Sequence, residues 1–296
     1  MSTHTLSNEL ITIQLNEFGA ELTSIKSNSN NTEYLWNGDP SYWKRQSPIL
    51  FPFVGSVKNK SYSYKGKTYP MSQHGFARDM KFSLISRYDN EIWLSLEATK
   101  ETLKVYPYMF RLELGYRIEG KIITVLWRVI NKDNKTMYFS IGGHPAFNCP
   151  IEGEGEQSDY YLRFDTEKPI HYILVNEDGM AVKKPFDQQS TLTTDNGLAL
   201  ITPHMFDMDA LIIEDNQCHE VSLLDPSKKP YVTLSFNAPL FGIWSPAKKN
   251  APFICIEPWY GRCDSSDFEG SLAEREWGNK LEAGQQFEAS YTIIIK

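Results

Sequence analysis

The sequence has few of the features that mark secreted, membrane-bound or nucleic-acid-binding proteins. Its 296 residues contain only four cysteines and no Cys-x-x-Cys pair, so we expect no disulfide framework. The net charge of -7 offers no basic surface to a phosphate backbone or an anionic membrane. No apolar run approaches the roughly 20 residues that a membrane-spanning helix needs, and residues 1–10 lack the apolar core of a signal peptide. We expect a cytoplasmic protein that binds neither nucleic acid nor a membrane.

Common metal-binding and serine-nucleophile motifs are missing as well. The six histidines form no His-x-x-x-His pair and no His-Glu-x-x-His motif, and no Gly-x-Ser-x-Gly elbow occurs. The sequence therefore predicts no metal centre, with a site built by the fold from two histidines and a glutamate as the alternative. We interpret the four cysteines as buried free thiols. They are Cys149, Cys218, Cys255 and Cys263.

Alternation of apolar and polar residues with a period of two is the main local pattern. Hydrophobic residues make up 41% of the chain, enough for a large core. Glycine-containing turns separate the alternating runs, as expected for packed antiparallel strands. The predicted strands cover residues 10–15, 92–96, 110–116, 122–129, 221–223, 231–236 and 290–295. We expect an all-β fold, one large antiparallel β-sandwich that forms a single domain over residues 1–296.

Helical patterning is scarce. Residues 271–277 are the best helical candidate, with Ser271 as the N-cap and Gly278 as the residue that ends the helix. A helix of this length is too short to be a main element of the fold.

Three segments interrupt the strand pattern by placing polar, titratable residues beside glycine, proline and aromatic residues. They are residues 72–79, 141–148 and 254–262. His144 follows two glycines and precedes a proline, a setting that fixes the backbone and lets another group approach closely. Glu257 follows an apolar run and is expected at the end of a buried strand, where burial raises the pKa of a carboxyl group toward useful base strength. His144 and Glu257 are therefore candidates for proton transfer.

Purely structural roles explain the same residues about as well on spacing alone. His74 and His144 are then hydrogen-bonded histidines in turns. Arg78 pairs with the adjacent aspartate, and Glu257 forms a salt bridge with Arg262.

Taken together, the motifs resemble those of the aldose 1-epimerase (galactose mutarotase) superfamily and are closest to its LacX-like branch. They occur in the family's order and span nearly the whole chain, which makes the match more specific than any single motif. They are His-Gly-Phe-Ala-Arg at 74–78, Tyr-Pro-Tyr at 106–108, Gly-Gly-His-Pro-Ala-Phe-Asn at 142–148, Asp-Ala-Leu-Ile at 209–212, Ile-Glu-Pro-Trp-Tyr-Gly at 256–261 and Leu-Glu-Ala-Gly at 281–284.

The resemblance implies a β-supersandwich with a shallow, open sugar cleft, and it implies a role for each matching residue. Glu257 matches the general base of the family, and His144 matches its general acid. His74 matches a second histidine, which hydrogen-bonds near the ring oxygen of the sugar. Asp209 matches an acidic residue that holds sugar hydroxyls.

The substrate implied by the resemblance is a free aldohexose, bound by a monomer or homodimer. Arg45 falls where an arginine often lines the family's cleft. It is followed by Gln46 and Ser47, whereas the branch that acts on hexose 6-phosphates usually shows Arg-Gly-Gly. Arg78 keeps the family motif, so a phosphorylated sugar stays open as an alternative. We count Arg45 and Arg78 among the candidate substrate-binding residues.

The chemistry of mutarotation fits these residues. A proton leaves the C1 hydroxyl while another reaches the ring oxygen, the ring opens, the C1–C2 bond rotates and the aldehyde recloses from its other face. A carboxylate and an imidazolium on opposite sides of the acetal carbon suffice. No electrons or groups leave the sugar, so no cofactor is expected. Trp259, Phe147 or Trp244 would supply an apolar face for the sugar ring.

Two other classes of function remain as alternatives. A carbohydrate-binding module would keep the fold without turnover, but it would need neither an acid nor a base. A glycoside hydrolase would need two carboxyl groups that bracket the bond, and only Glu257 stands in a convincing setting.

Overall fold

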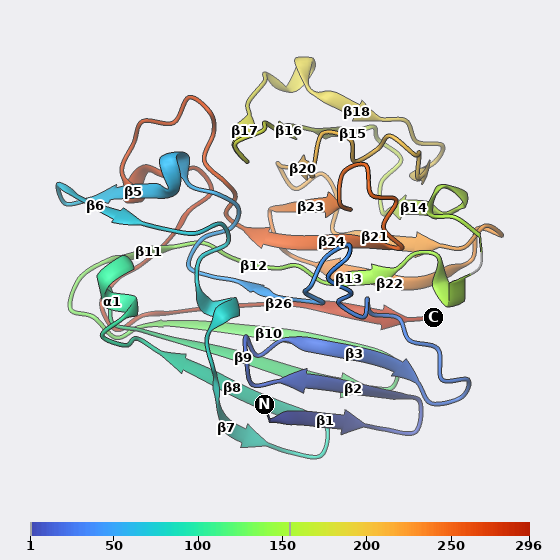
Figure 1. Ribbon diagram of the computed structural model, residues 1–296, viewed down its shortest axis with the longest axis horizontal. Coiled ribbons are helices and arrows are strands. Elements are labelled where there is room, and N and C mark those ends of the chain that lie inside the picture. Colours follow the sequence, from blue (N-terminus) through green and yellow to red (C-terminus); the bar gives the residue numbers. More distant parts are fainter. Residues whose placement is uncertain (1, 154) are drawn as a thin grey trace.

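A nine-stranded antiparallel sheet is the largest layer of the structure (Figure 1). The computed structural model describes residues 2–153 and 155–296. In spatial order the nine strands are β19 (Leu198–Leu200), β14 (Tyr161–Phe164), β21 (Glu220–Leu224), β22 (Pro230–Phe236), β26 (Gln286–Ile295), β10 (Ile122–Asn131), β9 (Phe110–Glu119), β8 (Glu91–Glu97) and β7 (Ser83–Arg87). The predicted alternation is visible in β10, which buries every second residue from Ile123 to Asn131.

A six-stranded sheet forms the second main layer. Its strands are β20 (Leu211–Ile213), β23 (Leu240–Trp244), β24 (Phe253–Tyr260), β12 (Ile141–Gly143) and β4 (Ile49–Leu50), with β13 (Ala146–Asn148) also paired to β24. The two main sheets pack face to face around the largest hydrophobic core. The Trp127 ring of β10 lies 6.4 Å from the Tyr260 ring of β24, and the Phe236 ring of β22 lies 5.2 Å from the Phe241 ring of β23. The predicted antiparallel β-sandwich is confirmed.

The strand β24 is buried on both faces except at its last residue. Ile254 and Ile256 face the main core, whereas Cys255 and Trp259 belong to smaller apolar clusters on the outer side of the sheet. Because side chains alternate along a strand, Glu257 shares this outer face. A second layer of loops and short strands therefore covers the carboxyl group.

Smaller sheets and short helices complete the structure. A three-stranded sheet contains β1 (Thr3–Ser7), β2 (Ile11–Asn16) and β3 (Leu22–Ser27). The two-stranded sheets are β5 (Ser61–Tyr64) with β6 (Lys67–Pro70), β11 (Met137–Phe139) with β25 (Asn279–Leu281), β15 (Ile170–Tyr172) with β18 (Ser190–Leu192), and β16 (Leu174–Val175) with β17 (Ala181–Val182). All seven predicted strands are confirmed.

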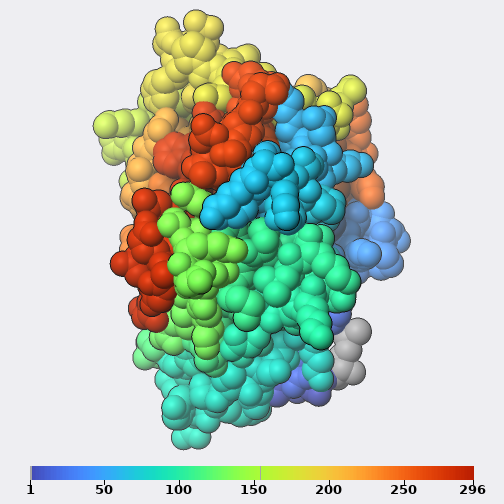
Figure 2. Space-filling model, turned by 90° about the vertical axis from the view of Figure 1, so that its left-hand side faces the viewer, coloured from blue at the N-terminus to red at the C-terminus, as the bar shows by residue number. Residues whose placement is uncertain are grey.

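Helices are few and short. In the part of the chain that the structure describes, the only α-helix is α1 (Thr102–Val105), and none of its helices is long and apolar enough to cross a membrane. The 3₁₀ turns are Lys58–Lys60, Ala77–Asp79, Ile151–Gly153, Gln157–Asp159, Phe186–Gln188 and Leu272–Glu274. Figure 2 shows the light-blue chain of β5 and β6 beside the red chain that follows β24. A hydrogen bond joins these two regions, since Lys58 Nζ, just before β5, donates to the carbonyl oxygen of Phe268 over 3.0 Å.

The helix predicted at 271–277 is shorter than expected. Ser271 is its N-cap, and the Glu274 carboxylate accepts hydrogen bonds from the backbone N–H and the hydroxyl of Ser271. The chain then turns to an extended conformation at Arg275. The buried guanidinium of Arg275 donates to Asp264 over 2.7 Å and to the carbonyl oxygen of Arg262 over 2.8 Å. These tertiary contacts end the helix before Gly278.

Two adjacent isoleucines of β10 test the assignment of the core. Ile123 is 0% exposed and Ile122 is 39% exposed. Ile123→Ala should lower the free energy of unfolding by about 2–5 kcal/mol, because it leaves a cavity between the sheets. Ile122→Ala should cost less than about 1 kcal/mol. Urea unfolding of both variants measures the difference, and equal losses would contradict the burial pattern of β10.

Candidate active site

The backbone pairing of β24 brings two of the candidate residues together. β12 pairs with β24 at Trp259, and β13 pairs with it at Cys255, so the connection between β12 and β13 crosses β24 opposite Glu257. His144 lies in that connection. Gly142 of β12 is needed for this approach, since a Cβ there would lie 2.6 Å from the Trp259 ring.

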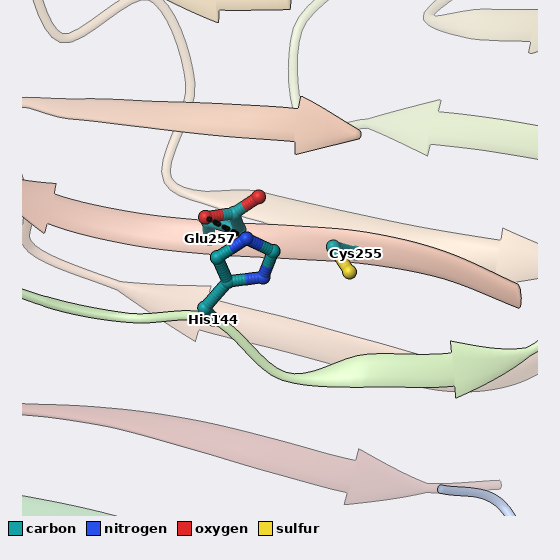
Figure 3. A group of neighbouring side chains, drawn as sticks. All are labelled: His144, Cys255 and Glu257. Atoms are coloured by element: carbon teal, nitrogen blue, oxygen red, sulfur yellow. Dashed lines mark ion pairs between the residues drawn. The ribbon is translucent and has the colours of Figure 1, made fainter. Parts of the chain in front are cut away.

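His144 and Glu257 form a close, buried pair. His144 Nε2 lies 3.3 Å from Glu257 Oε2, and the two residues are 6% and 1% exposed. Figure 3 shows the imidazole reaching from the strand connection toward the carboxyl group on β24. Glu257 lies inside β24 rather than at the end of a strand, because β24 continues to Tyr260. The expected strand-end position of Glu257 was therefore wrong.

Burial shifts the pKa values of this pair in opposite directions. The loss of solvent raises the pKa of Glu257 well above its ordinary value, and the negative charge of Asp209 adds to the effect. The loss of solvent also lowers the pKa of His144 to about 3, and the nearby positive charge of Arg78 acts in the same direction. Both shifts favour neutral groups, so the free pair keeps its proton on the carboxyl group.

His74 is held in one tautomer by the backbone of Gly55. His74 Nδ1 accepts a hydrogen bond from the backbone N–H of Gly55 over 3.0 Å, and the backbone N–H of His74 donates to the Gly55 carbonyl oxygen over 2.8 Å. Burial, helped by the charge of Arg78, lowers the pKa of His74 well below its ordinary value. The neutral ring therefore carries its proton on Nε2 and is a hydrogen-bond donor. The His74 ring lies 5.6 Å from the His144 ring.

Arg45 and Arg78 are partly buried next to the two histidines. Arg45 Nη2 donates to Asp79 Oδ1 over 2.7 Å, whereas Arg78 Nε lies 3.9 Å from the other oxygen of Asp79. Arg78 Nη2 donates to the carbonyl oxygen of Gln73 over 2.7 Å. Burial and the charge of Arg45 lower the pKa of Arg78 to about 10. Asp79 therefore pairs most closely with Arg45. The guanidinium of Arg78 is bonded to the backbone of Gln73 and does not only pair with Asp79.

The carboxylate of Glu21 anchors the segment that carries Arg45. Glu21 Oε1 accepts backbone hydrogen bonds from Gln46 over 2.8 Å and from Ser47 over 3.0 Å. Burial raises the pKa of Glu21 despite these bonds. Glu21 lies in a stretch with no motif, so sequence reasoning missed it.

Asp209 lines a wide groove that also includes Gln73, the residue before His74. The groove has a volume of about 710 Å³ and is lined by Gln73, Asp209, residues 56–60 and residues 176–180, among others. Asp209 is exposed, in a left-handed conformation with φ of 72°. Its Oδ1 accepts the N–H of Ala210 over 2.8 Å. The carboxylate of this exposed residue is therefore accessible from the groove.

Aromatic side chains border the pair, although they are not all the expected ones. The Trp43 ring stacks on the His144 ring at 4.7 Å, and the Trp244 ring meets it edge-on at 5.4 Å. Both tryptophans are half-buried, so each keeps an accessible surface. Phe147 and Trp259 are core residues, at 0% and 5% exposure, and offer no face to a ligand. Sequence reasoning missed Trp43, although it is only two residues before Arg45.

The alternative structural role of Glu257 is excluded by the position of Arg262. The Arg262 guanidinium bonds to Glu214 and Glu276 instead. Cys255, two residues before Glu257, is another neighbour of the pair that carried no motif signal. The four cysteines are free and buried, as predicted.

Comparisons with known proteins agree with this geometry. The sequence model of the family described as aldose 1-epimerase matches residues 2–293. Protein LacX from Lactococcus lactis subsp. lactis is 34% identical over 303 residues, which cover 98% of each chain. A solved galactose mutarotase related enzyme from Lactobacillus acidophilus has a TM-score of 0.93 at 33% identity, over 100% of this chain and 97% of that one. A galactose mutarotase-like protein from Lactobacillus casei has a TM-score of 0.92 at 29% identity, over 100% of both chains. The expected mutarotase-like supersandwich is confirmed.

Substitution of Gly75 tests how tightly the backbone next to His74 is packed. Its φ is +70°, and a Cβ would lie 2.2 Å from the carbonyl oxygen of Phe51. Gly66 has a φ of +73° with nothing within 4 Å, so it is a matched control for the backbone strain alone. Gly66→Ala should cost about 1 kcal/mol, and Gly75→Ala should cost about 1–3 kcal/mol more because the clash adds to the strain. Thermal unfolding compares the two; similar midpoints would show that the backbone around His74 is not tightly packed.

Proposed function

The chain belongs to the aldose 1-epimerase family, and we propose that it interconverts the α and β anomers of a free aldohexose. The observation that carries this proposal is the buried pair of His144 and Glu257, whose nitrogen and oxygen atoms lie 3.3 Å apart. An acid and a base this close can serve the ring oxygen and the C1 hydroxyl of one sugar from the same side of the acetal carbon, not from the opposite sides expected from the sequence. The protein is then a carbohydrate isomerase.

In the proposed reaction, Glu257 is the general base and His144 the general acid. With sugar bound, the carboxylate of Glu257 takes the proton of the C1 hydroxyl while the imidazolium of His144 gives a proton to the ring oxygen. The C1–O bond of the ring breaks and the open aldehyde forms. Rotation about C1–C2 and the reverse proton transfers close the ring as the other anomer. The site starts and ends with the same number of protons.

The burial of the pair explains why ring opening would be favoured. The starting state has a charged carboxylate and a charged imidazolium, whereas the open-chain state leaves Glu257 protonated and His144 neutral. The dry surroundings favour neutral forms of both groups, as their shifted pKa values indicate. The environment therefore stabilises the open-chain state relative to the closed ring bound to the charged pair, and this charged pair must first form from the neutral free pair. Only protons move, so the proposal involves no cofactor.

The surrounding residues suit a sugar. We assign the Nε2–H of His74 to the ring-oxygen side of the substrate, and the carboxylate of Asp209 to hydroxyls in the groove. Trp43 and Trp244 offer half-buried aromatic surfaces next to His144, where the C–H face of a sugar ring can pack.

In both nearby arginines Nη2 already has a protein partner, which favours a free aldohexose over a sugar phosphate; the buried Nε of Arg78 has no hydrogen-bond partner among the described residues. Arg45 is paired with Asp79, and Arg78 donates to the backbone of Gln73. We further propose that the chain acts as one domain in the cytoplasm, where four free thiols would stay reduced.

Replacement of the acid and the base should abolish most of the rate. Glu257→Gln and His144→Asn should each slow anomer exchange by about 10²–10⁴-fold, because each removes one proton-transfer group. The measurement is polarimetry of freshly dissolved α-glucose and α-galactose. Glu113→Gln and His204→Asn are the controls, a buried glutamate paired with Arg111 and Arg128 and an exposed histidine.

The controls should keep the wild-type rate. If the wild-type protein exchanges the anomers of free sugars no faster than buffer alone, the free-aldose proposal is wrong. NMR exchange measurements with hexose 6-phosphates would then test the alternative substrate. No acceleration of anomer exchange with either free sugars or hexose 6-phosphates would favour a carbohydrate-binding module.

Asp209 should affect binding more than chemistry. Asp209→Asn should raise KM roughly tenfold or more, because it weakens charge-assisted hydrogen bonds to sugar hydroxyls, with kcat little changed. Asp207→Asn, in the same loop, is the matched control; Asp207 bonds to His204 at 2.9 Å. Initial rates over a range of sugar concentrations separate the two constants. An unchanged KM would remove Asp209 from the binding site.

A further inference from the structure

Cys255 lies beside the proposed acid–base pair but has no part in the sugar reaction. It is fully buried and shares the outer face of β24 with Glu257. One ligand atom each from His144, Cys255 and Glu257 lie within 4.8 Å of one another. Figure 3 shows the carboxyl group and the thiol on one strand, with the imidazole coming from the neighbouring chain segment. Thiol, imidazole and carboxylate groups are the ligands that Zn²⁺ takes in proteins.

Two polar atoms of this cluster have unused bonding capacity. His144 Nδ1 and Glu257 Oε2 are buried and form no hydrogen bond with the residues that the structure describes. Buried nitrogen and oxygen atoms in native proteins nearly always have a hydrogen-bond partner, so these two atoms indicate that a ligand binds here. A sugar would explain the two atoms, but it would make no use of the buried thiol that lies beside them on the same face of β24.

We propose that a thiophilic divalent cation of the zinc class binds to His144, Cys255 and Glu257 and blocks the site. Three protein ligands leave a fourth position for water, which is the arrangement of an open zinc site. Bonds of about 2.0–2.3 Å place tetrahedral ligand atoms about 3.5 Å apart. The ligand atoms of this cluster therefore need to move by only about 1 Å.

The charges of the cluster suit a divalent cation. On binding, Cys255 and Glu257 each release a proton to solvent and bind as thiolate and carboxylate, while His144 binds as neutral imidazole. The 2+ charge of the ion is balanced by two anionic ligands. The buried complex is neutral, which avoids the cost of an uncompensated charge in the interior.

The inhibitory consequence rests on the proposed function, because cation and sugar use the same His144 and Glu257. A cation on these residues removes the base and the acid together. Sugar and cation should therefore compete, so that Zn²⁺ raises the apparent KM without changing kcat at saturating sugar.

The test uses Co²⁺ as a spectroscopic probe and Zn²⁺ as the inhibitor. Titration of the whole protein with Co²⁺ should produce a thiolate-to-cobalt charge-transfer band, which Zn²⁺ then displaces. Cys255→Ala should lose the band and weaken inhibition by Zn²⁺ by at least about tenfold, while it keeps the basal rate. Cys149→Ala is the matched control, since Cys149 is also 0% exposed and lies outside the cluster. Cys255→Ser, which nearly keeps the side-chain volume, serves if Cys255→Ala does not fold.

The outcomes separate this inference from the proposed function. A cobalt band that depends on Cys255, in a protein without anomer exchange, would support the metal site and reject the proposed activity. An active enzyme that shows no band and no competition by Zn²⁺ would overturn the metal site alone. A band of equal strength in wild type and Cys255→Ala would overturn it as well, because the thiolate would then come from another cysteine.

Discussion

The burial of β24 on both faces is the constraint on which the candidate site depends. One face of this strand packs into the core between the two large sheets, and the other is covered by loops and short strands. A carboxyl group on the covered face is removed from most solvent, which would be costly for an isolated charge. The nearby imidazole of His144 offers it a proton-transfer partner at 3.3 Å. The sandwich thus creates the environment, and the connection between β12 and β13 supplies the partner.

Burial has the same physical effect on four ionisable groups in and around the pair. It raises the pKa of Glu257 and Cys255 and lowers the pKa of His74 and His144, so each group is held in its neutral form. When a reaction moves protons between side chains and changes their charges, the energies of its steps depend on such an environment. A cation that brings its own charge can use the same groups as ligands. The proposed catalysis and the proposed metal inhibition therefore follow from one property of the strand.

Much of the fold was predictable because strand alternation is a local signal. The alternating runs in β10 and β26 carry enough apolar and β-branched residues to indicate paired strands without knowledge of their neighbours. The motifs around His74, His144 and Glu257 were also recognisable, since glycine and proline mark positions where the backbone must approach closely. The helix at 271–277 was overestimated because tertiary contacts of Arg275 end it early.

The all-β class, the candidate acid and base, and the free state of the cysteines could all be predicted from the sequence, because these properties depend on residue type and short-range pattern. Which distant residues meet depended on the tertiary structure. It placed Trp43 on His144, set His144 beside Cys255 and Glu257, and paired Arg262 with Glu214 and Glu276 rather than with Glu257. The widest of these contacts, between His144 and Glu257, joins residues 113 positions apart, and such contacts follow from strand register and sheet packing. No local pattern records which strands will become neighbours.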